Sequence, residues 1–523
     1  MQRFNNRFAN QSGVPDSGLL KQVIISTAVY PIVLITLATI AVRLTISFSH
    51  HLILGMDGGY YPLQVRNILN TGYLSFNDVP LYFYFCALII KIIALFGWVA
   101  TNETVISVVK IIDSTIFPLL AIPLFMILSR KGYKIPIFAQ FALMIFAVFS
   151  FSSLIMLGDL QKNAFAIPFL LMFIYLFEGY LISGEKRKLF LALATMLIIA
   201  LTHFGVFVFS LAFFTIALFV VYRKKAILPS ILILLTGFSV IYVFDASRAL
   251  RLITFWKVIF ERFGLVNVSL PLPLLINILF SYFLVVFTIF QYQKIRRGKD
   301  DVAGYMMVTL IILLVIFAFP FYEMQYVHRF NLLLFIPQIL LMIYLIRMNQ
   351  KFAGFFAISL VLLTAFSIFI YFSEAKKPVI TDQEFHDLQN INAFLPDNKE
   401  RTIIIARHGL EFWTAWALNV KVANDRAMNQ LAVDKYNYMI ILQQKHGLDE
   451  MPPGNRPPSQ PSLAGVGLPP MRPPMRQPGG SLSGQPGGLP GGGPDRPPMG
   501  PHLPENLKLV YSSPYFNAYK KPN

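Results

Sequence analysis

Residues 81–99 read LYFYFCALIIKIIALFGWV, an apolar run with Lys91 near its middle. The run is long enough to cross a bilayer, so it decides on which side every later loop lies. Basic loops follow it, near 130–134, 186–188, 223–225, 294–299 and 347–351. If 81–99 crossed, these loops would all lie outside, against the positive-inside rule. We therefore predict that 81–99 lies along the outer interface, as a juxtamembrane or shallow re-entrant helix.

Apolar runs of this kind dominate the 523-residue chain. It is 56% hydrophobic and 15% aromatic, its mean hydropathy is +0.60, and only 13% of its residues are charged. One soluble core cannot hold that much apolar surface, so the composition predicts a membrane protein. The net charge of +18 comes mostly from short basic clusters between apolar runs. That pattern is typical of cytoplasmic loops and argues against nucleic-acid binding.

About eleven segments are long and apolar enough to be predicted as spans. They lie at 22–42, 105–128, 135–157, 164–182, 189–202, 205–222, 228–244, 273–292, 304–321, 330–346 and 353–372. The pair 189–202 and 205–222 is short, so a tight turn or a re-entrant pair is an alternative there. The first run lacks a cleavage site, which makes 1–21 a cytoplasmic segment and 22–372 an all-α polytopic membrane domain.

The composition changes after residue 372, and 373–523 is predicted to be a small extracytoplasmic α/β module. Its expected helices and strands lie near 381–395, 402–406, 409–418, 419–423, 436–442, 507–511 and 515–519. Residues 450–505 are dominated by Pro, Gly and Met and cannot bury a core. We predict that 450–505 is a disordered insertion in one loop of the module.

The outer loop 43–104 contains the most informative polar stretch. Residues 55–84 read GMDGGYYPLQVRNILNTGYLSFNDVPLYFY, in which Asp57 precedes an amphipathic helix that ends near Gly72. Other ionisable side chains of the predicted outer loops are Asp78, Asp159, Lys162, His203, Glu323, His328 and Arg329. The predicted inner loops hold basic clusters and little else. We therefore expect the chemistry on the outer side.

The stretch 55–84 resembles the GT-C superfamily of membrane glycosyltransferases, which includes protein O-mannosyltransferases, lipid A aminoarabinose transferases and oligosaccharyltransferases. These proteins share an acidic residue just after the first span, then a helix, then a Pro-Leu-Tyr start of the next helix. Asp57 and Pro80-Leu81-Tyr82 match that pattern. The resemblance extends loosely over the membrane part and to the C-terminal module. It departs at Gly58, where several branches carry a second acidic residue, and in lacking the carboxylates of the oligosaccharyltransferase metal site.

The resemblance implies an inverting transfer of a sugar from a polyprenyl-phosphate donor to an acceptor on the outer face. Asp57 would be the catalytic general base for the acceptor hydroxyl, a role worth ~10²–10⁴-fold in rate. Asp159 resembles the family's second acidic position, which would orient the acceptor or help to hold a metal. The alternative is that each aspartate caps the helix that follows it, with Lys162 as the local partner of Asp159.

Arg329 is expected to bind the donor phosphate, because family members often carry an arginine at the outer end of a late span. A guanidinium group suits this role, being planar, always charged and able to bind phosphate through two bonds. Substrate-binding roles are also predicted for His328, Glu323, Tyr60 and Lys162. Alternatively, Arg329 is an interface residue paired with Glu323.

Two further polar positions stand out. His203 lies between two short apolar runs, where an ionisable group is a functional candidate and is included among the substrate-binding residues; a hydrogen-bonded structural histidine is the alternative. Lys110 and Asp113, three residues apart on one helix, are predicted to form a structural ion pair.

No cofactor is predicted to be required, and a divalent metal is an alternative that is not favoured. The expected partners are the lipid-linked sugar donor, an envelope glycan, lipid or protein acceptor, and membrane lipids. The expected location is the plasma (inner) membrane with a cytoplasmic N-terminus. Two other classes stay open. A secondary transporter would place ionisable residues near the midplane of two related halves, and a structural envelope protein would use the outer module to bind partners.

Overall fold

The computed structural model describes residues 18–130, 135–246, 249–250, 253, 270–295, 301–322, 324–374, 376–397, 399–425, 436, 438–445 and 507–521. The chain divides into two compact units, Met1–Asp382 and Gln383–Asn523. The predicted insertion 450–505 lies outside the described residues, as does nearly all of the N-terminal segment.

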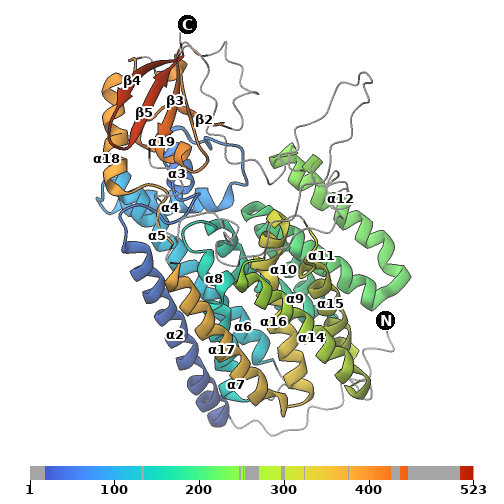
Figure 1. Ribbon diagram of the computed structural model, residues 1–523. Coiled ribbons are helices and arrows are strands. Elements are labelled where there is room, and N and C mark those ends of the chain that lie inside the picture. The colour runs from blue at the N-terminus through green and yellow to red at the C-terminus, as the bar shows by residue number, and fades with distance from the viewer. Residues whose placement is uncertain are drawn as a thin grey trace, which may run out of the picture. The chain divides into compact units, whose positions relative to one another are not determined.

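The first unit consists of α-helices, most of which run side by side in a bundle (Figure 1). They are α2 (Gly18–Phe48), α3 (Tyr60–Thr71), α4 (Leu81–Leu95), α5 (Asn102–Ile116), α6 (Ala121–Leu128), α7 (Ile137–Phe149), α8 (Phe151–Ile155), α9 (Gln161–Ser183), α10 (Lys186–Thr202), α11 (Phe204–Tyr222), α12 (Ile227–Phe244), α14 (Leu272–Ile295), α15 (Asp301–Phe317), α16 (Met324–Met348) and α17 (Phe352–Ser373). Short 3-10 helices, η1 (Phe117–Leu120) and η2 (Arg223–Ala226), join α5 to α6 and α11 to α12.

Seven helical stretches in the described part of the chain are long and apolar enough to cross a membrane, judged by length and composition. They are Asn102–Leu128, Ile137–Ile155, Gln161–Ser183, Phe204–Phe244, Leu272–Gln291, Tyr326–Met348 and Phe352–Ser373. Shorter apolar stretches are Ile32–Phe48, which is the part of α2 whose side chains are described, Leu81–Leu95 and Val302–Phe317. A membrane-embedded, mostly helical protein is therefore what the structure supports.

The prediction of about eleven spans is wrong by these criteria. The runs predicted at 205–222 and 228–244 are two helices, α11 and α12, joined at η2, where Arg223 has a φ of 53°. They are counted together as one apolar stretch, Phe204–Phe244. Helices α10 and α15 have 17 residues each. At 1.5 Å per residue they extend for ~25 Å, which is less than the ~30 Å of a bilayer's hydrocarbon core.

Helix α4, which covers most of 81–99, has 15 residues and extends for ~22 Å. The segments before and after it meet. His51 Nε2 lies 2.8 Å from Glu103 Oε2, and Lys110 Nζ donates to the carbonyls of His50 and His51 at 2.7 and 2.8 Å. The start of α5 therefore lies beside the end of α2, although α3 and α4 come between them in the sequence. An interfacial position of 81–99 requires this arrangement.

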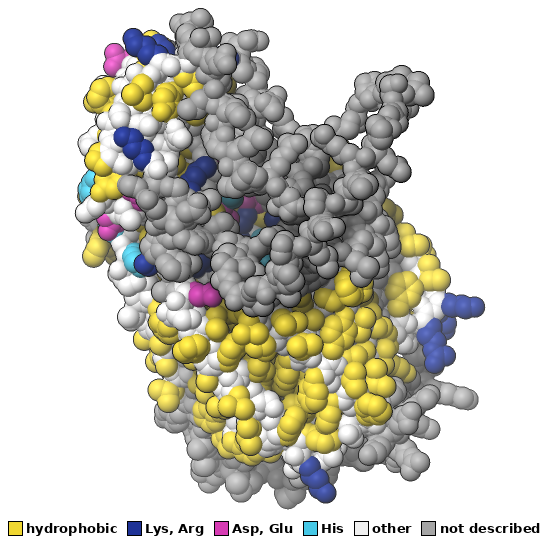
Figure 2. All heavy atoms as spheres, viewed as in Figure 1, with side chains coloured by type: hydrophobic (Ala, Val, Ile, Leu, Met, Phe, Trp, Pro, Cys, Tyr) yellow, Lys and Arg dark blue, Asp and Glu magenta, His cyan; other side chains and the backbone are white. Residues whose placement is uncertain are grey.

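The helices bury aromatic and aliphatic side chains between them and leave others on the outside. Between α9 and α11, for example, the rings of Phe177 and Phe214 pack with centroids 4.7 Å apart. On the outer surface, large side chains such as Leu228 of α12 are exposed. Figure 2 shows hydrophobic side chains covering much of this face of the helices. An apolar outer surface of this extent fits contact with lipid.

The second unit is built on a five-stranded sheet with the order β2-β1-β3-β5-β4. Its strands are β1 (Thr402–Ala406), β2 (Lys421–Asn424), β3 (Tyr438–Gln444), β4 (Lys508–Ser512) and β5 (Phe516–Lys520), and its helices are α18 (Asp382–Asn390) and α19 (Leu410–Leu418). Strand β1 pairs in parallel with β2 and β3, whereas β5 is antiparallel to β3 and β4. The small C-terminal sheet expected from the sequence is confirmed.

Candidate functional site

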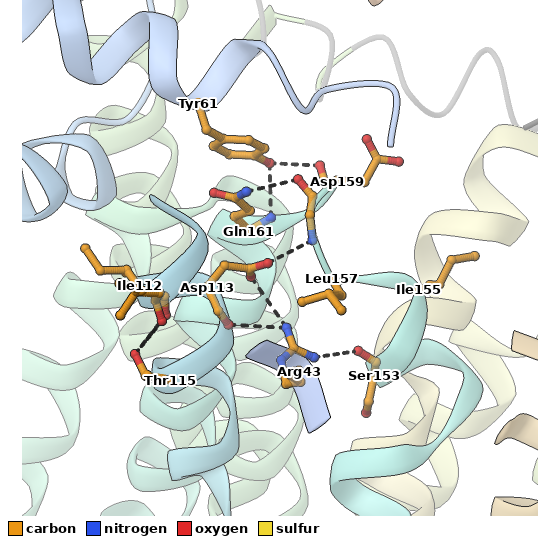
Figure 3. A network of polar contacts seen from close by, with 12 residues as sticks. Arg43, Tyr61, Ile112, Asp113, Thr115, Ser153, Ile155, Leu157, Asp159 and Gln161 are labelled. Carbon is orange, nitrogen blue, oxygen red and sulfur yellow. Dashed lines mark hydrogen bonds and ion pairs between the residues drawn. The ribbon is translucent and has the colours of Figure 1, made fainter. Parts of the chain in front are cut away.

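The loop before α3 and the loop before α9 bring Asp57 and Asp159 together. The backbone N–H of Asp57 donates to Asp159 Oδ1 at 2.7 Å. The Tyr61 hydroxyl donates to the Asp159 carbonyl at 2.9 Å and accepts from the Gln161 N–H at 3.1 Å (Figure 3). Two segments about a hundred positions apart in sequence are therefore joined at the two aspartates.

Two glycines allow this close approach. Gly55 has a φ of 86°, and a Cβ there would lie 2.6 Å from Cβ and Cγ of Asp159. A Cβ on Gly58 would lie 2.4 Å from the carbonyl oxygen of Ile53. In this backbone, a side chain at either position forces a neighbour to move. A residue larger than glycine, an acidic one included, therefore does not fit beside Asp57 in this backbone.

Neither aspartate caps the helix that follows it. Helix α3 begins at Tyr60 with Gly59 in the N-cap position. Helix α9 begins at Gln161 with Leu160 in the N-cap position. Asp57 and Asp159 each lie before those caps. Neither aspartate therefore occupies the N-cap position that the capping alternative assigned to it.

The cation beside Asp159 is Lys376, which follows α17 and was not singled out from the sequence. Its Nζ lies 3.3 Å from Asp159 Oδ2. It also donates to the carbonyls of Ile155 at 2.8 Å and Leu157 at 3.3 Å. The exposed fractions of the Lys376 and Asp159 side chains are 14% and 24%, so the pair is partly shielded from water. The signal in the sequence was the Lys376-Lys377 pair directly after the last apolar run, on the predicted side of Asp159.

Lys162 pairs with Asp78 rather than with Asp159. Its ammonium group donates to the Asp78 carboxylate, and the exposed fractions of the two side chains are only 9% and 1%. The Tyr60 hydroxyl also donates to Asp78, at 2.5 Å, and accepts from Gln64 Nε2 at 3.1 Å. Lys162 Nζ lies 5.6 and 5.4 Å from the ring centroids of Tyr60 and Phe83. Tyr60 and Lys162, two predicted substrate-binding residues, thus belong to one buried polar cluster centred on Asp78.

A second buried ion pair anchors the Asp159 loop to the bundle. Arg43 donates to the Asp113 carbonyl at 3.3 Å and to the Ser153 carbonyl at 3.2 Å, and lies 3.5 Å from Asp113 Oδ1. The other carboxylate oxygen of Asp113 accepts from the Gly158 N–H at 2.8 Å. Figure 3 shows this network beneath Asp159. Lys110 bonds to backbone carbonyls instead, so the predicted Lys110–Asp113 pair is wrong.

His203 has a structural role at the junction of α10 and α11. It is the N-cap of α11, and its Nδ1 accepts from the Val206 N–H at 3.2 Å. This is the hydrogen-bonded alternative that the sequence left open.

The predicted phosphate-binding residues lie in the second turn of α16. His328 is half-buried and Arg329 is exposed. Glu323, and with it the predicted pairing of Glu323 with Arg329, lies outside the described residues. The Ser152 hydroxyl donates to the Asn331 carbonyl at 3.2 Å, which puts the start of α16 beside the segment that leads to Asp159. Arg329 therefore lies at the same end of the helices as the two aspartates.

The pKa of the Tyr61 hydroxyl depends on its burial and on the two nearby aspartates. Burial raises the pKa of its hydroxyl well above the ordinary value, and the charges of Asp57 and Asp159 raise it further. Tyr61 therefore keeps its proton at neutral pH and remains a donor to the Asp159 carbonyl. Among the described residues, no group of three or more His, Cys, Asp and Glu side chains is placed to hold a metal ion.

No model of a known protein family matches the chain, and no curated protein sequence matches it significantly. The fold and the charge distribution define a class all the same: a helical membrane protein with two aspartates, joined by a backbone-to-carboxylate hydrogen bond, and a lysine at one end of its helices.

Proposed function

We propose that the chain is a GT-C-like membrane glycosyltransferase that moves a sugar from a polyprenyl-phosphate donor to an acceptor hydroxyl on the outer face of a bacterial plasma membrane. The observation that carries the proposal is the meeting of Asp57 and Asp159 at one end of apolar helices. A carboxylate at the end of membrane-embedded helices can reach both a lipid-linked donor and an acceptor in the aqueous phase. In the simplest competing role each aspartate would be the N-cap of the next helix, but Gly59 and Leu160 occupy those positions.

In this proposal Asp57 takes the proton of the acceptor hydroxyl. The acceptor oxygen bonds to the anomeric carbon while the bond from that carbon to the phosphate oxygen breaks, and the lipid phosphate leaves with the electron pair. Asp159 is a positioning residue, because it holds Asp57 through the backbone N–H. Arg329, exposed at the same end, binds the phosphate, where a guanidinium stabilises the charge of the leaving group.

The test of activity is mass spectrometry of envelope glycans and glycolipids from cells that express the chain, its Asp57→Asn variant, or neither. We expect Asp57→Asn to lower the product by ~10²-fold or more, since general-base catalysis is lost. The matched control is Asp397→Asn, at an exposed aspartate of the second unit. Product at the wild-type level in a folded Asp57→Asn variant contradicts the proposed role of Asp57.

The proposal also requires the loop that carries Asp57 and the start of α5 to lie on one side, with the N-terminus on the other. Cys86 is the only cysteine and is buried, so the chain suits labelling at introduced cysteines. We expect a membrane-impermeant maleimide added outside intact cells to label Tyr73→Cys and Glu103→Cys, both at exposed positions. Lys351→Cys should react only after permeabilisation. Labelling of Tyr73→Cys without Glu103→Cys would mean that α4 spans the membrane.

A further inference from the structure

An apolar cavity lies among α9, α10, α11 and α12. Its volume is about 340 Å³, within the ~300–1,000 Å³ typical of small-molecule sites. Its apolar wall is formed by Leu189, Leu193, Phe214, Leu218, Pro229 and Ile233. Tyr180, which also lines it, is 19 residues after the first residue of α9. That distance is ~28 Å along the helix, so the cavity is remote from Asp57 and belongs to a different site.

The polar side of this cavity is positively charged. Lys225 lines it, and Arg223 and Lys224 precede Lys225 in η2. All three side chains are exposed. The stretch 204–244 contains no Asp or Glu, so no carboxylate within it offsets the three charges. Cations of this kind near a membrane surface attract anionic lipids.

The ligand that matches both features has an alkyl chain and an anionic head. Helix α12 presents exposed apolar side chains beside the cavity, Leu228 and Leu232 among them. Those side chains fit contact with lipid tails. A free phosphate group would satisfy the cations and leave the apolar wall unused, whereas a neutral lipid would use the wall alone.

We propose that this cavity binds one acyl chain of an anionic phospholipid, with the lipid phosphate held by Arg223, Lys224 and Lys225. The site is separate from the proposed transferase reaction and does not depend on it. The positive-inside pattern assigns η2 to the cytoplasmic leaflet, where anionic lipids supply the ligand.

The test is native mass spectrometry of the purified full-length chain from nanodiscs of phosphatidylcholine with phosphatidylglycerol. We expect the protein to retain phosphatidylglycerol over phosphatidylcholine. Lys225→Glu should lower that preference by roughly tenfold, because it reverses one charge at the headgroup. Its matched control is Lys351→Glu, an exposed lysine at the N-cap of α17 that does not line the cavity.

The apolar half of the site is tested by filling it. Ile233→Trp should reduce retention of phosphatidylglycerol, whereas Leu232→Trp, at a position outside the lining, should not. Leu193→Trp is a second filling variant if Ile233→Trp does not fold. The proposal is overturned if the filling variants retain the lipid, if Lys225→Glu behaves like Lys351→Glu, or if excess inorganic phosphate displaces the lipid. The last outcome would mean that the cations act without the cavity.

Discussion

Replacing Lys162 by Met tests the buried cluster around Asp78. The side chains of Lys162 and Asp78 are 9% and 1% exposed, and breaking a buried pair by removing one partner costs about 3–5 kcal/mol. In this variant the Asp78 carboxylate would still accept hydrogen bonds from the Tyr60 hydroxyl, at 2.5 Å, and from the backbone N–H of Val79, at 2.8 Å. Because these donors still stabilise the carboxylate, we expect the lower end, about 3 kcal/mol.

The Asp78→Asn substitution completes a double-mutant cycle. In Lys162→Met/Asp78→Asn no buried charge is left alone, so we expect the double variant to cost at least ~2 kcal/mol less than the sum of the singles. The measurement is equilibrium unfolding in mixed micelles, followed by circular dichroism. Lys188→Met is the matched control, because Lys188 pairs with Glu185 at 2.8 Å on the surface. We expect no measurable change there.

Two results would refute this reasoning. One is a Lys162→Met variant as stable as Lys188→Met, which would mean that the cluster is hydrated rather than buried. The other is a double variant whose cost equals the sum of the single costs. In that case Lys162 and Asp78 would not act on each other, despite their contact.

The remaining predictions concern the Asp57 loop and the turn that precedes it. Gly58→Ala should lower both the stability and the proposed activity, because its Cβ would lie 2.4 Å from a backbone carbonyl oxygen. Gly354→Ala is the control: Gly354 lies in a helix with open space around it, so this variant should be neutral or stabilising. Both variants are measured in the same unfolding and product assays. Burial lowers the pKa of His50 below its ordinary value. As pH falls through the ordinary pKa of histidine, ~6.5, the unfolded state takes up a proton before the folded state does. Thermal stability should therefore fall as pH falls below about 7, and His50→Gln should flatten that fall. An unchanged pH profile in His50→Gln would contradict this assignment.

The helical class and the C-terminal sheet could be predicted because they depend on local patterns. Apolar runs identify the helices, and the alternation of β-rich and helical stretches identifies β1, α19 and β3. The number of spans was predicted less accurately than the fold class. The hydropathy pattern did locate the break between 205–222 and 228–244, where η2 lies. It does not show whether a helix of 17 residues such as α10 is long enough to cross a membrane.

For the candidate site, the sequence predicted only that its residues lie in loops on the same side of the membrane. Asp57 and Asp159 were expected in the same set of loops, but Lys376 is more than two hundred positions from Asp159, and no local pattern links them. The spacing rule failed for Lys110 and Asp113 for a physical reason. Buried charges need several hydrogen bonds, and each side chain obtains better partners from distant segments.

The positions of the cations bear on which one would meet the donor phosphate in the proposed reaction. An ammonium group has three donors, and those of Lys376 face the Asp159 carboxylate and two backbone carbonyls. Lys162 is committed to Asp78 beneath the rings of Tyr60 and Phe83. Drawing either lysine toward a phosphate would cost the contacts that hold the aspartates in place. Arg329 is exposed at the same end of the helices, so a phosphate there gains a partner without dismantling the loop that positions Asp57.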